Sequence, residues 1–431
     1  MSTELNPKYY LVEDWKDYDQ GLVATLGERY FKIQGIKAYS INTGSPVPSA
    51  ITSNYPHALS FIKVLKKNLV NYPKNYKLNI LDLGSGSGLF ARSLLEAARD
   101  ENILDRICVI LADLSANALN EIKKLKVLGG FEEHKNYQFI KLDILDPKNA
   151  KDLNNKIYFL PKISACTLNY IYDVMPTIIL RPSKDDGFEK LQFRFLEKNI
   201  GQEFKQNISD DELKTNLNYL KNLLIDDRWV PYDIEKQNTL QQKYFYLLKD
   251  ENYGGQFAYS YGSLAITESI YGLLDDFGFI FCAEMKNNPN TLRPFEIYGN
   301  CTAHYINETL ISKLATSLGA TKFFTQDHFL QKIIYFKNKI SYDDDFLKQE
   351  FIDKSDTDVY VDIKQILMNL NSPHSHKIAK LVVDELVKLD PYSCFSFYMQ
   401  AQAARLSGDQ KTASQKLLAA KALDFLGDYN L

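Results

Sequence analysis

The residues best suited to bind a nucleotide lie in one short stretch, Asp82-Leu83-Gly84-Ser85-Gly86-Ser87-Gly88. An apolar run from Ile80 to Leu83 predicts a buried strand before the glycines, and a helical pattern begins at Leu89. Three glycines at alternate positions let the backbone turn tightly and approach a ligand, because no Cβ intervenes. Strand, glycine turn and helix together form the nucleotide-binding unit of doubly wound folds.

The spacing of the glycines distinguishes between nucleotide-binding motifs. The dinucleotide fingerprint is G-x-G-x-x-G, whereas this stretch reads G-x-G-x-G. A P-loop needs Gly-Lys-Ser/Thr, and the stretch contains no lysine. An acid followed by G-x-G-x-G resembles motif I of the class I S-adenosylmethionine (SAM) methyltransferases. The alternative is a glycine-rich turn that binds no ligand.

Acidic residues stand near the ends of the first three predicted strands: Asp82, Asp113 and Asp143. Ligands of doubly wound sheets bind beyond the carboxyl ends of the strands. Asp113 is placed to accept both ribose hydroxyls of a nucleoside, and Asp143 would face an adenine amino group. Helix N-capping is the alternative for Asp113 and Asp143.

The elements that must position these residues alternate along the chain. Alternating strands and helices predict βαβ units and a mainly parallel sheet, which is a Rossmann-like α/β fold. Residues 181–262 interrupt this alternation with turn-rich and charged, helix-like stretches. We expect a helical insertion there, either a substrate-binding cap or a solvated excursion. The predicted strands are 79–83, 106–112, 137–142, 162–167, 277–283 and 321–325, and the predicted helices are 58–69, 89–100, 115–128, 263–276 and 307–318.

The chain of 431 residues is too long for one ordinary domain. We expect a leader with the first helix over 1–77, which would form a lid, and a catalytic domain over 78–340. Helical periodicity dominates 345–431, where the segments 386–391 and 420–425 match at an offset of 34 residues. That period resembles a tetratricopeptide repeat (TPR). One and a half repeats are too few to form a stable solenoid by themselves. We therefore expect this unit to pack on the catalytic domain or to form a homodimer contact.

Composition and charge narrow the function classes. A net charge of −3 gives no indication of a basic surface for nucleic-acid binding. A hydrophobic fraction of 45% is typical of a soluble globular protein. The five cysteines contain no C-x-x-C and the six histidines no H-E-x-x-H, so we expect no metal site. The chain has neither a signal-peptide pattern nor an apolar run of membrane-helix length, which predicts a cytoplasmic protein without a membrane partner.

Four further elements resemble the MidA family, which includes the mitochondrial complex I assembly methyltransferases. They occur in the order of the family motifs E-x-S-P-x-L, N-E-x-x-D-A-L-P, D-I-T-A-H-V-N/D-F and T-Q-x-x-F-L. The sequence departs from the family at Tyr170, where a glutamate is usual, and at Ala283-Glu284-Met285, where D-Y-G usually ends the fifth strand. The glycine-rich N-terminal signature is not recognisable. The four elements are residues 112–119, 168–176, 300–307 and 325–330.

The resemblance implies a SAM-dependent methyltransferase whose product is S-adenosyl-L-homocysteine (SAH). Some members of the family methylate arginine side chains in partner proteins, so we expect a protein or peptide substrate. The residues predicted to bind the cofactor are Asp82, Leu83, Gly84, Ser85, Gly86, Gly88, Asp113, Leu114, Asp143, Ile144 and Asn169.

The predicted catalytic residues are Asp173, Glu284, Asn169 and His304. A guanidinium stays protonated, and bringing it beside a sulfonium costs Coulomb energy that nearby carboxylates offset. Asp173 and Glu284 follow the fourth and fifth strands and are the best candidates for that role. Asn169 would bind the amino-acid part of SAM or the nucleophile. His304 is either a base or a structural histidine.

Two other functions remain open at this stage. In the first, the protein methylates a small molecule, and the 181–262 insertion closes over a compact substrate. In the second, it is a SAM-binding assembly factor with weak or no catalysis, whose C-terminal unit holds a partner.

Overall fold

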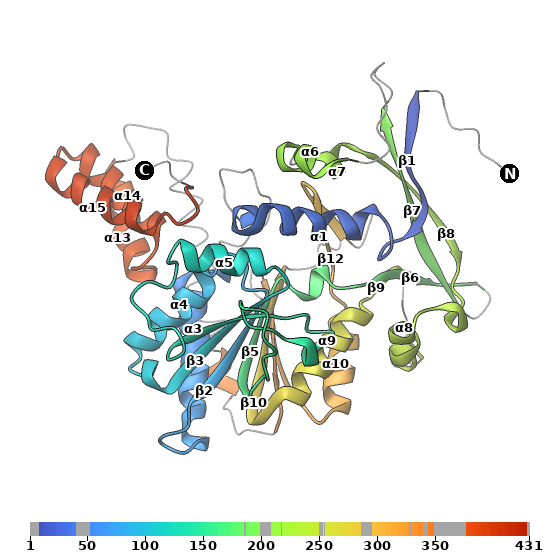
Figure 1. Cartoon of the computed structure of the whole chain (residues 1–431), viewed down its shortest axis with the longest axis horizontal. Helices are drawn as coiled ribbons and strands as arrows, with labels where there is room; N and C mark the ends of the chain where they lie inside the picture. Colours follow the sequence, from blue (N-terminus) through green and yellow to red (C-terminus); the bar gives the residue numbers. More distant parts are fainter. Residues whose placement is uncertain are drawn as a thin grey trace.

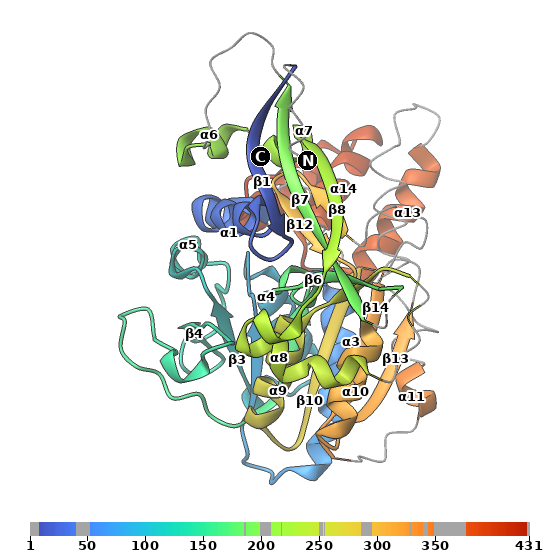
Figure 2. The ribbon, with the colours of Figure 1, turned by 90° about the vertical axis from the view of Figure 1, so that its right-hand side faces the viewer.

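Two larger sheets organise the chain in the computed structural model (Figure 1). One is a seven-stranded main sheet, and the other is a five-stranded antiparallel sheet that stands above it (Figure 2). The structure describes residues 8–39, 52–184, 187–198, 208–216, 218–249, 253, 255–285, 295–326, 330–338, 344–348 and 376–428. Part of the predicted domain boundary, residues 340–343, and residues 349–375 of the segment that follows lie outside these residues.

The main sheet has the strand order β13-β14-β10-β5-β2-β3-β4. Its parallel strands are β4 (Tyr137–Lys141), β3 (Ile107–Asp113), β2 (Leu78–Leu83), β5 (Ile163–Asn169) and β10 (Leu274–Met285). Strand β14 (Leu330–Phe336) runs antiparallel between β10 and β13 (Thr321–Gln326). The predicted mainly parallel sheet is confirmed, and the strand order reverses beside β2, which makes a topological switch point between β2 and β5.

Helices cover both faces of the main sheet, because successive residues of its buried strands point to opposite sides. Ile80 packs with α3 (Tyr55–Asn68), α4 (Leu89–Asp100) and α5 (Ala116–Lys124), whereas Leu81 packs with α9 (Tyr261–Leu273) and α10 (Glu308–Ser317). All five helices lie where the hydrophobic periodicity predicts them, although α5 ends four residues early.

The insertion is mainly β-sheet, which corrects the predicted helical insertion. Strand β7 (Phe188–Lys198) pairs with β1 from the N-terminus, with β6 and with β8. In β7, Leu191, Phe193 and Phe195 are buried and alternate with polar residues, which is a period of two. The charged flanks of the insertion obscured this pattern. The other strands are β1 (Tyr9–Asp17), β6 (Ile178–Pro182), β8 (Leu224–Pro231) and β9 (Phe257–Tyr259).

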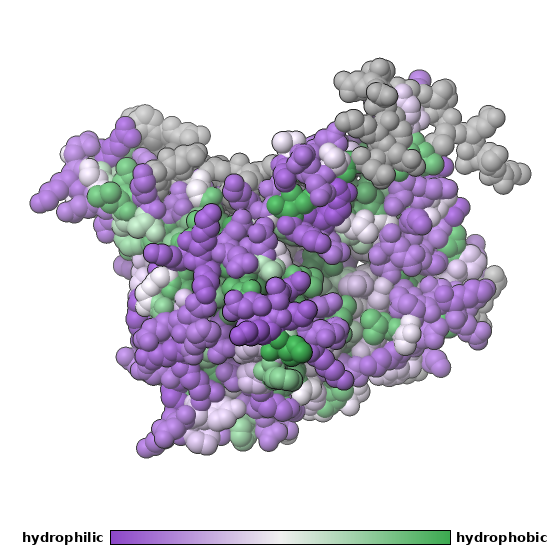
Figure 3. Space-filling view, viewed as in Figure 1, coloured by the Kyte–Doolittle hydropathy of each residue, from purple (hydrophilic) through white to green (hydrophobic). Residues whose placement is uncertain are grey.

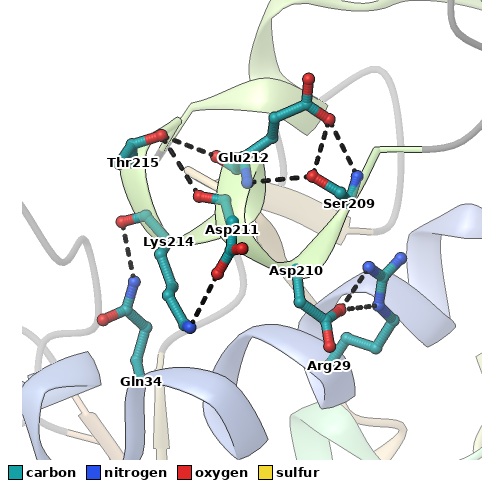
Figure 4. Close-up of polar contacts among 8 residues, drawn as sticks. All are labelled: Arg29, Gln34, Ser209, Asp210, Asp211, Glu212, Lys214 and Thr215. Atoms are coloured by element: carbon teal, nitrogen blue, oxygen red, sulfur yellow. Dashed lines mark hydrogen bonds and ion pairs between the residues drawn. The ribbon is translucent and has the colours of Figure 1, made fainter.

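The N-terminal segment and the insertion together form one unit, residues 9–39 and 178–259, which we call the cap. Helix α1 (Leu22–Gln34) is tied to the short helix α6 (Asp210–Thr215) of the insertion (Figure 4). Arg29 Nη2 lies 2.5 Å from Asp210 Oδ1, and Gln34 Nε2 donates to Lys214 O at 3.0 Å. The remaining short helices of the cap are α7 (Tyr219–Asn222) and α8 (Thr239–Tyr244), and the hairpin β11 (Phe295–Tyr298) and β12 (Cys301–His304) packs beside α1.

Three consecutive helices, α13 (His376–Leu389), α14 (Cys394–Leu406) and α15 (Gln410–Leu423), form the C-terminal unit. It packs on the helices of the main sheet through Tyr392, whose hydroxyl donates to Asp100 of α4 at 2.8 Å, and through Phe425, whose ring lies 5.5 Å from Arg92. The resemblance to a TPR and the partner-binding role stay predictions. The short helix α11 (Asp344–Lys348) precedes the unit.

The surface in Figure 3 is mostly hydrophilic, with scattered apolar side chains. Among the described residues, no helix combines the length and the apolar character needed to cross a membrane.

Candidate functional site

The glycine turn connects β2 to α4 at the switch point of the main sheet. Gly84, Gly86 and Gly88 have φ values of 68°, 52° and 74°, a region that side-chain-bearing residues rarely adopt. Ile171 and Tyr39 fill the space that a Cβ on Gly84 or Gly86 would need. The turn therefore requires glycine for both its conformation and its close neighbours.

Asp113 is brought directly against this turn. Its Oδ2 accepts from the Gly86 N–H at 3.1 Å, and its Oδ1 accepts from the Ser115 N–H at 2.8 Å. Burial raises the pKa of Asp113, and these two bonds oppose that rise. The N-cap of α5 is Ser115, so the helix-capping alternative for Asp113 is wrong. Two carboxylate oxygens have about four lone-pair sites, so the group can still accept ribose hydroxyls.

Asp82 lies below the turn, at the end of β2, and is only 3% exposed. Its Oδ1 accepts from Thr167 Oγ1 at 2.9 Å, while Oδ2 has no hydrogen-bond partner among the described residues. Burial raises the pKa of Asp82 to about 6. Ser85 Oγ donates to Asp82 O at 2.8 Å and thereby fixes the entry into the turn.

The other predicted cofactor-binding residues lie in different surroundings. Leu83 and Ile144 are buried in the core cluster that includes α9. Leu114 is 57% exposed, and Asp143 is exposed and caps a turn by accepting from the Leu145 N–H at 2.9 Å. Asp143 thus caps a turn and not a helix, so the helix-capping alternative is wrong here too, and its contact with adenine stays a prediction.

Asp173 and Glu284 are two buried acids on the far side of the switch point from Asp113. Glu284 ends β10, is fully buried, and accepts from the Ile171 and Tyr172 N–H groups at 3.1 and 2.8 Å. Asp173 follows β5 and is 6% exposed. Within the described residues, Glu284 Oε2 and Asp173 Oδ1 have no hydrogen-bond partner. The acids thus present buried oxygens with unused acceptor capacity.

The two acids also have altered protonation equilibria. Burial raises the pKa of Asp173 to about 7. Burial and the neighbouring Asp173 raise the pKa of Glu284 well above its ordinary value. Each ionised carboxylate disfavours ionisation of the other, so a proton on one acid favours the charged form of its neighbour.

These pKa shifts predict a pH dependence of stability. A carboxyl whose folded-state pKa is raised stabilises the fold fully below its unfolded pKa, near 3.8 for Asp173, and this contribution is lost as the pH rises through about 7. We expect the free energy of unfolding of the wild type to fall by about 3 kcal/mol relative to Asp173→Asn between pH 5 and pH 8. Urea unfolding of both proteins across this range measures the difference. Parallel curves would contradict it.

Asn169 ends β5. Its Oδ1 lies 3.3 Å from Nε2 of His57, a residue of α3. The next residue, Tyr170, has a φ of 55°, which is uncommon for an aromatic residue and stores strain at the site. No sequence pattern indicated His57, because it lies in the first turn of a helix that is far along the chain from Asn169. Tyr170 was visible only as a departure from the family pattern.

His304 is engaged on both nitrogens. Its Nε2 lies 2.7 Å from Thr177 Oγ1 and 3.2 Å from Met175 O, and its Nδ1 lies 3.4 Å from Ser260 Oγ. Burial lowers the pKa of His304 to about 4, so the ring is neutral at physiological pH. These bonds connect β12 with the segment after β5 and with the start of α9, which favours the structural interpretation.

We therefore expect His304→Ala to lower the free energy of unfolding by about 1–3 kcal/mol, because its partners lose buried hydrogen bonds. The shape of the pH profile of turnover should stay that of the wild type. Urea unfolding and turnover measured from pH 5.5 to 9 test both statements. A basic limb that disappears in the variant would restore His304 as the base.

The sequence matches no protein-family model and no curated protein. Among solved structures, the chain is similar to an uncharacterized COG1565 superfamily protein from Burkholderia thailandensis, with 13% identity, a TM-score of 0.47, and coverage of 77% of this chain and 90% of the other. It is also similar to a COG1565 superfamily member from the same organism bound to SAH, with 10% identity and a TM-score of 0.48. This match covers 78% of this chain and 90% of the other. The third is magnesium protoporphyrin IX methyltransferase from Synechocystis with bound SAH, with 12% identity and a TM-score of 0.33. This match covers 72% of this chain and 93% of the other.

Because the TM-scores are below 0.5, the assignment of the class rests on the strand order and on the site. These define a mixed α/β protein of the doubly wound class, with its candidate ligand site at the switch point between β2 and β5. Among the described residues, no group of three His, Cys, Asp or Glu side chains is placed to hold a metal ion.

Proposed function

We propose that this protein is a SAM-dependent methyltransferase. The observation that carries the proposal is the contact between Asp113 and Gly86 at the switch point of a sheet ordered β4-β3-β2-β5-β10-β14-β13, with β14 antiparallel. In this strand order the glycine turn and Asp113 lie at the crevice where doubly wound sheets bind their ligands. The motifs that resemble the MidA family support the same conclusion.

The residues around the glycine turn fit the cofactor. Gly84 and Gly86 leave the backbone free of Cβ atoms, and the buried Asp113 keeps lone pairs for the two ribose hydroxyls. The unpartnered Oδ2 of Asp82 is a further acceptor below the turn. When bound, SAM would supply an electrophilic methyl group.

We propose further that the acceptor is a cationic nitrogen of a protein or peptide, most simply an arginine side chain. A buried acid without a partner is costly unless a cation or a set of donors meets it. Asp173 and Glu284 each have one such oxygen. A guanidinium has five N–H donors in a planar fork, which suits two neighbouring carboxyl groups.

The same acids suit the proton balance of the reaction. The acceptor nitrogen forms a bond to the methyl carbon as the carbon–sulfur bond breaks, and the nitrogen must lose one proton. A carboxylate whose pKa lies near the working pH accepts such a proton effectively. Asp173, whose pKa burial raises to about 7, meets this requirement.

The decisive experiment incubates the protein with methyl-labelled SAM and a cell lysate, then separates proteins from small molecules. Label on arginine in acid-precipitated protein is the expected result, and Asp113→Ala is the negative control. Label recovered only in the small-molecule fraction would favour a small-molecule acceptor. SAH binding measured by calorimetry without any labelled product would favour the assembly-factor function.

A further inference from the structure

One aromatic residue of the cap lies directly on the glycine turn. A Cβ built on Gly86 would lie 2.6 Å from Cζ and 2.9 Å from the hydroxyl oxygen of Tyr39. The ring of Tyr39 therefore occupies the space that the missing side chain of Gly86 leaves open. Tyr39 belongs to the turn of 3₁₀ helix η1 (Gly35–Tyr39), which follows α1.

The position of this ring is fixed by contacts on several sides. The Ile36 N–H donates to Glu121 Oε2 of α5 at 2.9 Å, and Ile36 and Ala38 are buried. Phe31 stacks on Tyr39, with ring centroids 5.6 Å apart and an angle of 29° between the planes. The helix that precedes the turn is itself tied to α6, as Figure 4 shows for Arg29. These contacts hold the ring in place before any ligand binds.

The chemistry of Tyr39 suits a neighbour of the cofactor. Burial and the nearby Asp113 carboxylate raise the pKa of Tyr39, so its hydroxyl stays protonated and its ring stays neutral. A neutral aromatic face packs against a purine or ribose and attracts a cation through its quadrupole. Asp113 and Tyr39 both lie against Gly86, one from β3 and the other from the cap.

We propose that the ring of Tyr39 forms a wall of the cofactor site, so that the N-terminal segment contributes directly to cofactor binding. This inference rests on the proposed function. It assigns a role in cofactor binding to the segment 35–39, which lies far in the sequence from the motifs at the strand ends.

Calorimetric titration with SAH, which needs no acceptor and no turnover, tests the inference. We expect Tyr39→Ala to raise the Kd for SAH at least tenfold, because the wall is lost. Tyr39→Phe keeps the ring and should stay within threefold of the wild type. Trp15→Ala is the matched control, because Trp15 is a cap aromatic that stacks on Arg194 and Arg228, 4.8 and 4.5 Å from its ring.

The outcomes separate failure of the inference from failure of the function. If Tyr39→Ala binds SAH as tightly as the wild type, or more tightly, the ring is not a wall and the inference is wrong. Equal weakening by Trp15→Ala would assign the loss to a disturbed cap and would also overturn it. A wild type that binds no SAH would overturn the proposed function itself. Thermal unfolding of each variant without SAH verifies that it is folded.

Discussion

Asparagine in place of Asp173 is expected to reduce turnover at least a hundredfold and to leave the protein no less stable. Asparagine keeps the shape of the side chain but removes the charge that would face the cationic acceptor. A hundredfold loss corresponds to about 2.7 kcal/mol of transition-state stabilisation, a usual size for one preorganised electrostatic contact. Stability is retained because the variant no longer buries a carboxyl whose Oδ1 has no partner among the described residues.

Steady-state kinetics with the identified substrate measure this effect. Glu284→Gln should also reduce turnover. The matched control is Asp275→Asn, at the opposite end of β10. Asp275 accepts from Tyr72 Oη at 2.7 Å and from Ser164 Oγ at 2.6 Å, so its replacement should cost stability and leave turnover unchanged. Near wild-type turnover for both Asp173→Asn and Glu284→Gln would argue against an arginine acceptor and favour a small molecule.

Loss of Asp113 should abolish most cofactor affinity. Asp113→Ala removes two charge-assisted hydrogen bonds to ribose, each worth about 1.5–3 kcal/mol, which corresponds to at least a hundredfold weaker SAH binding. The variant also frees the Gly86 N–H, so the turn loses its anchor on β3.

Calorimetry with SAH measures this loss. Asp152→Ala is a suitable control, because Asp152 also accepts from backbone N–H groups, those of Asn154 and Lys156, but lies outside the site. An unchanged SAH affinity in Asp113→Ala would refute the placement of the ribose.

Local sequence patterns predicted six of the seven strands of the main sheet and half of the candidate site, but they missed β14 (Leu330–Phe336). Two buried strands, the glycine turn and Asp113 follow one another within about 35 residues. The hydrophobic period of these strands differs from that of the helix between them. Asp173 and Glu284 could also be paired in advance, because β5 and β10 are adjacent parallel strands and their carboxyl ends meet. The strand-end rule of doubly wound sheets carries this information.

The cap could not be predicted in the same way. Strand β1 pairs with β7, and Tyr10 lies opposite Glu197, a partner far along the chain that only the tertiary fold selects. The contacts of His57 with Asn169 and of Tyr39 with Gly86 likewise join a helix or turn of the first 57 residues to strand ends. Pairings of this kind have no local signature, so sequence reasoning identified the sheet and missed the residues that cover it.

The pairing of β1 with β7 also sets an order of events during synthesis. The first strand of the cap leaves the ribosome long before its partner, and from Tyr9 to Lys198 the delay is roughly 10–40 s at ordinary translation rates. Throughout this time β1 has an unpaired edge, and helix α1 lacks its contact with α6 in the later part of the cap. The half of the main sheet that carries the glycine turn can assemble meanwhile from β2, β3 and β4. The nascent chain thus exposes an unpaired strand edge until β7 is made, and such an edge is a site for wrong pairing that a chaperone can cover.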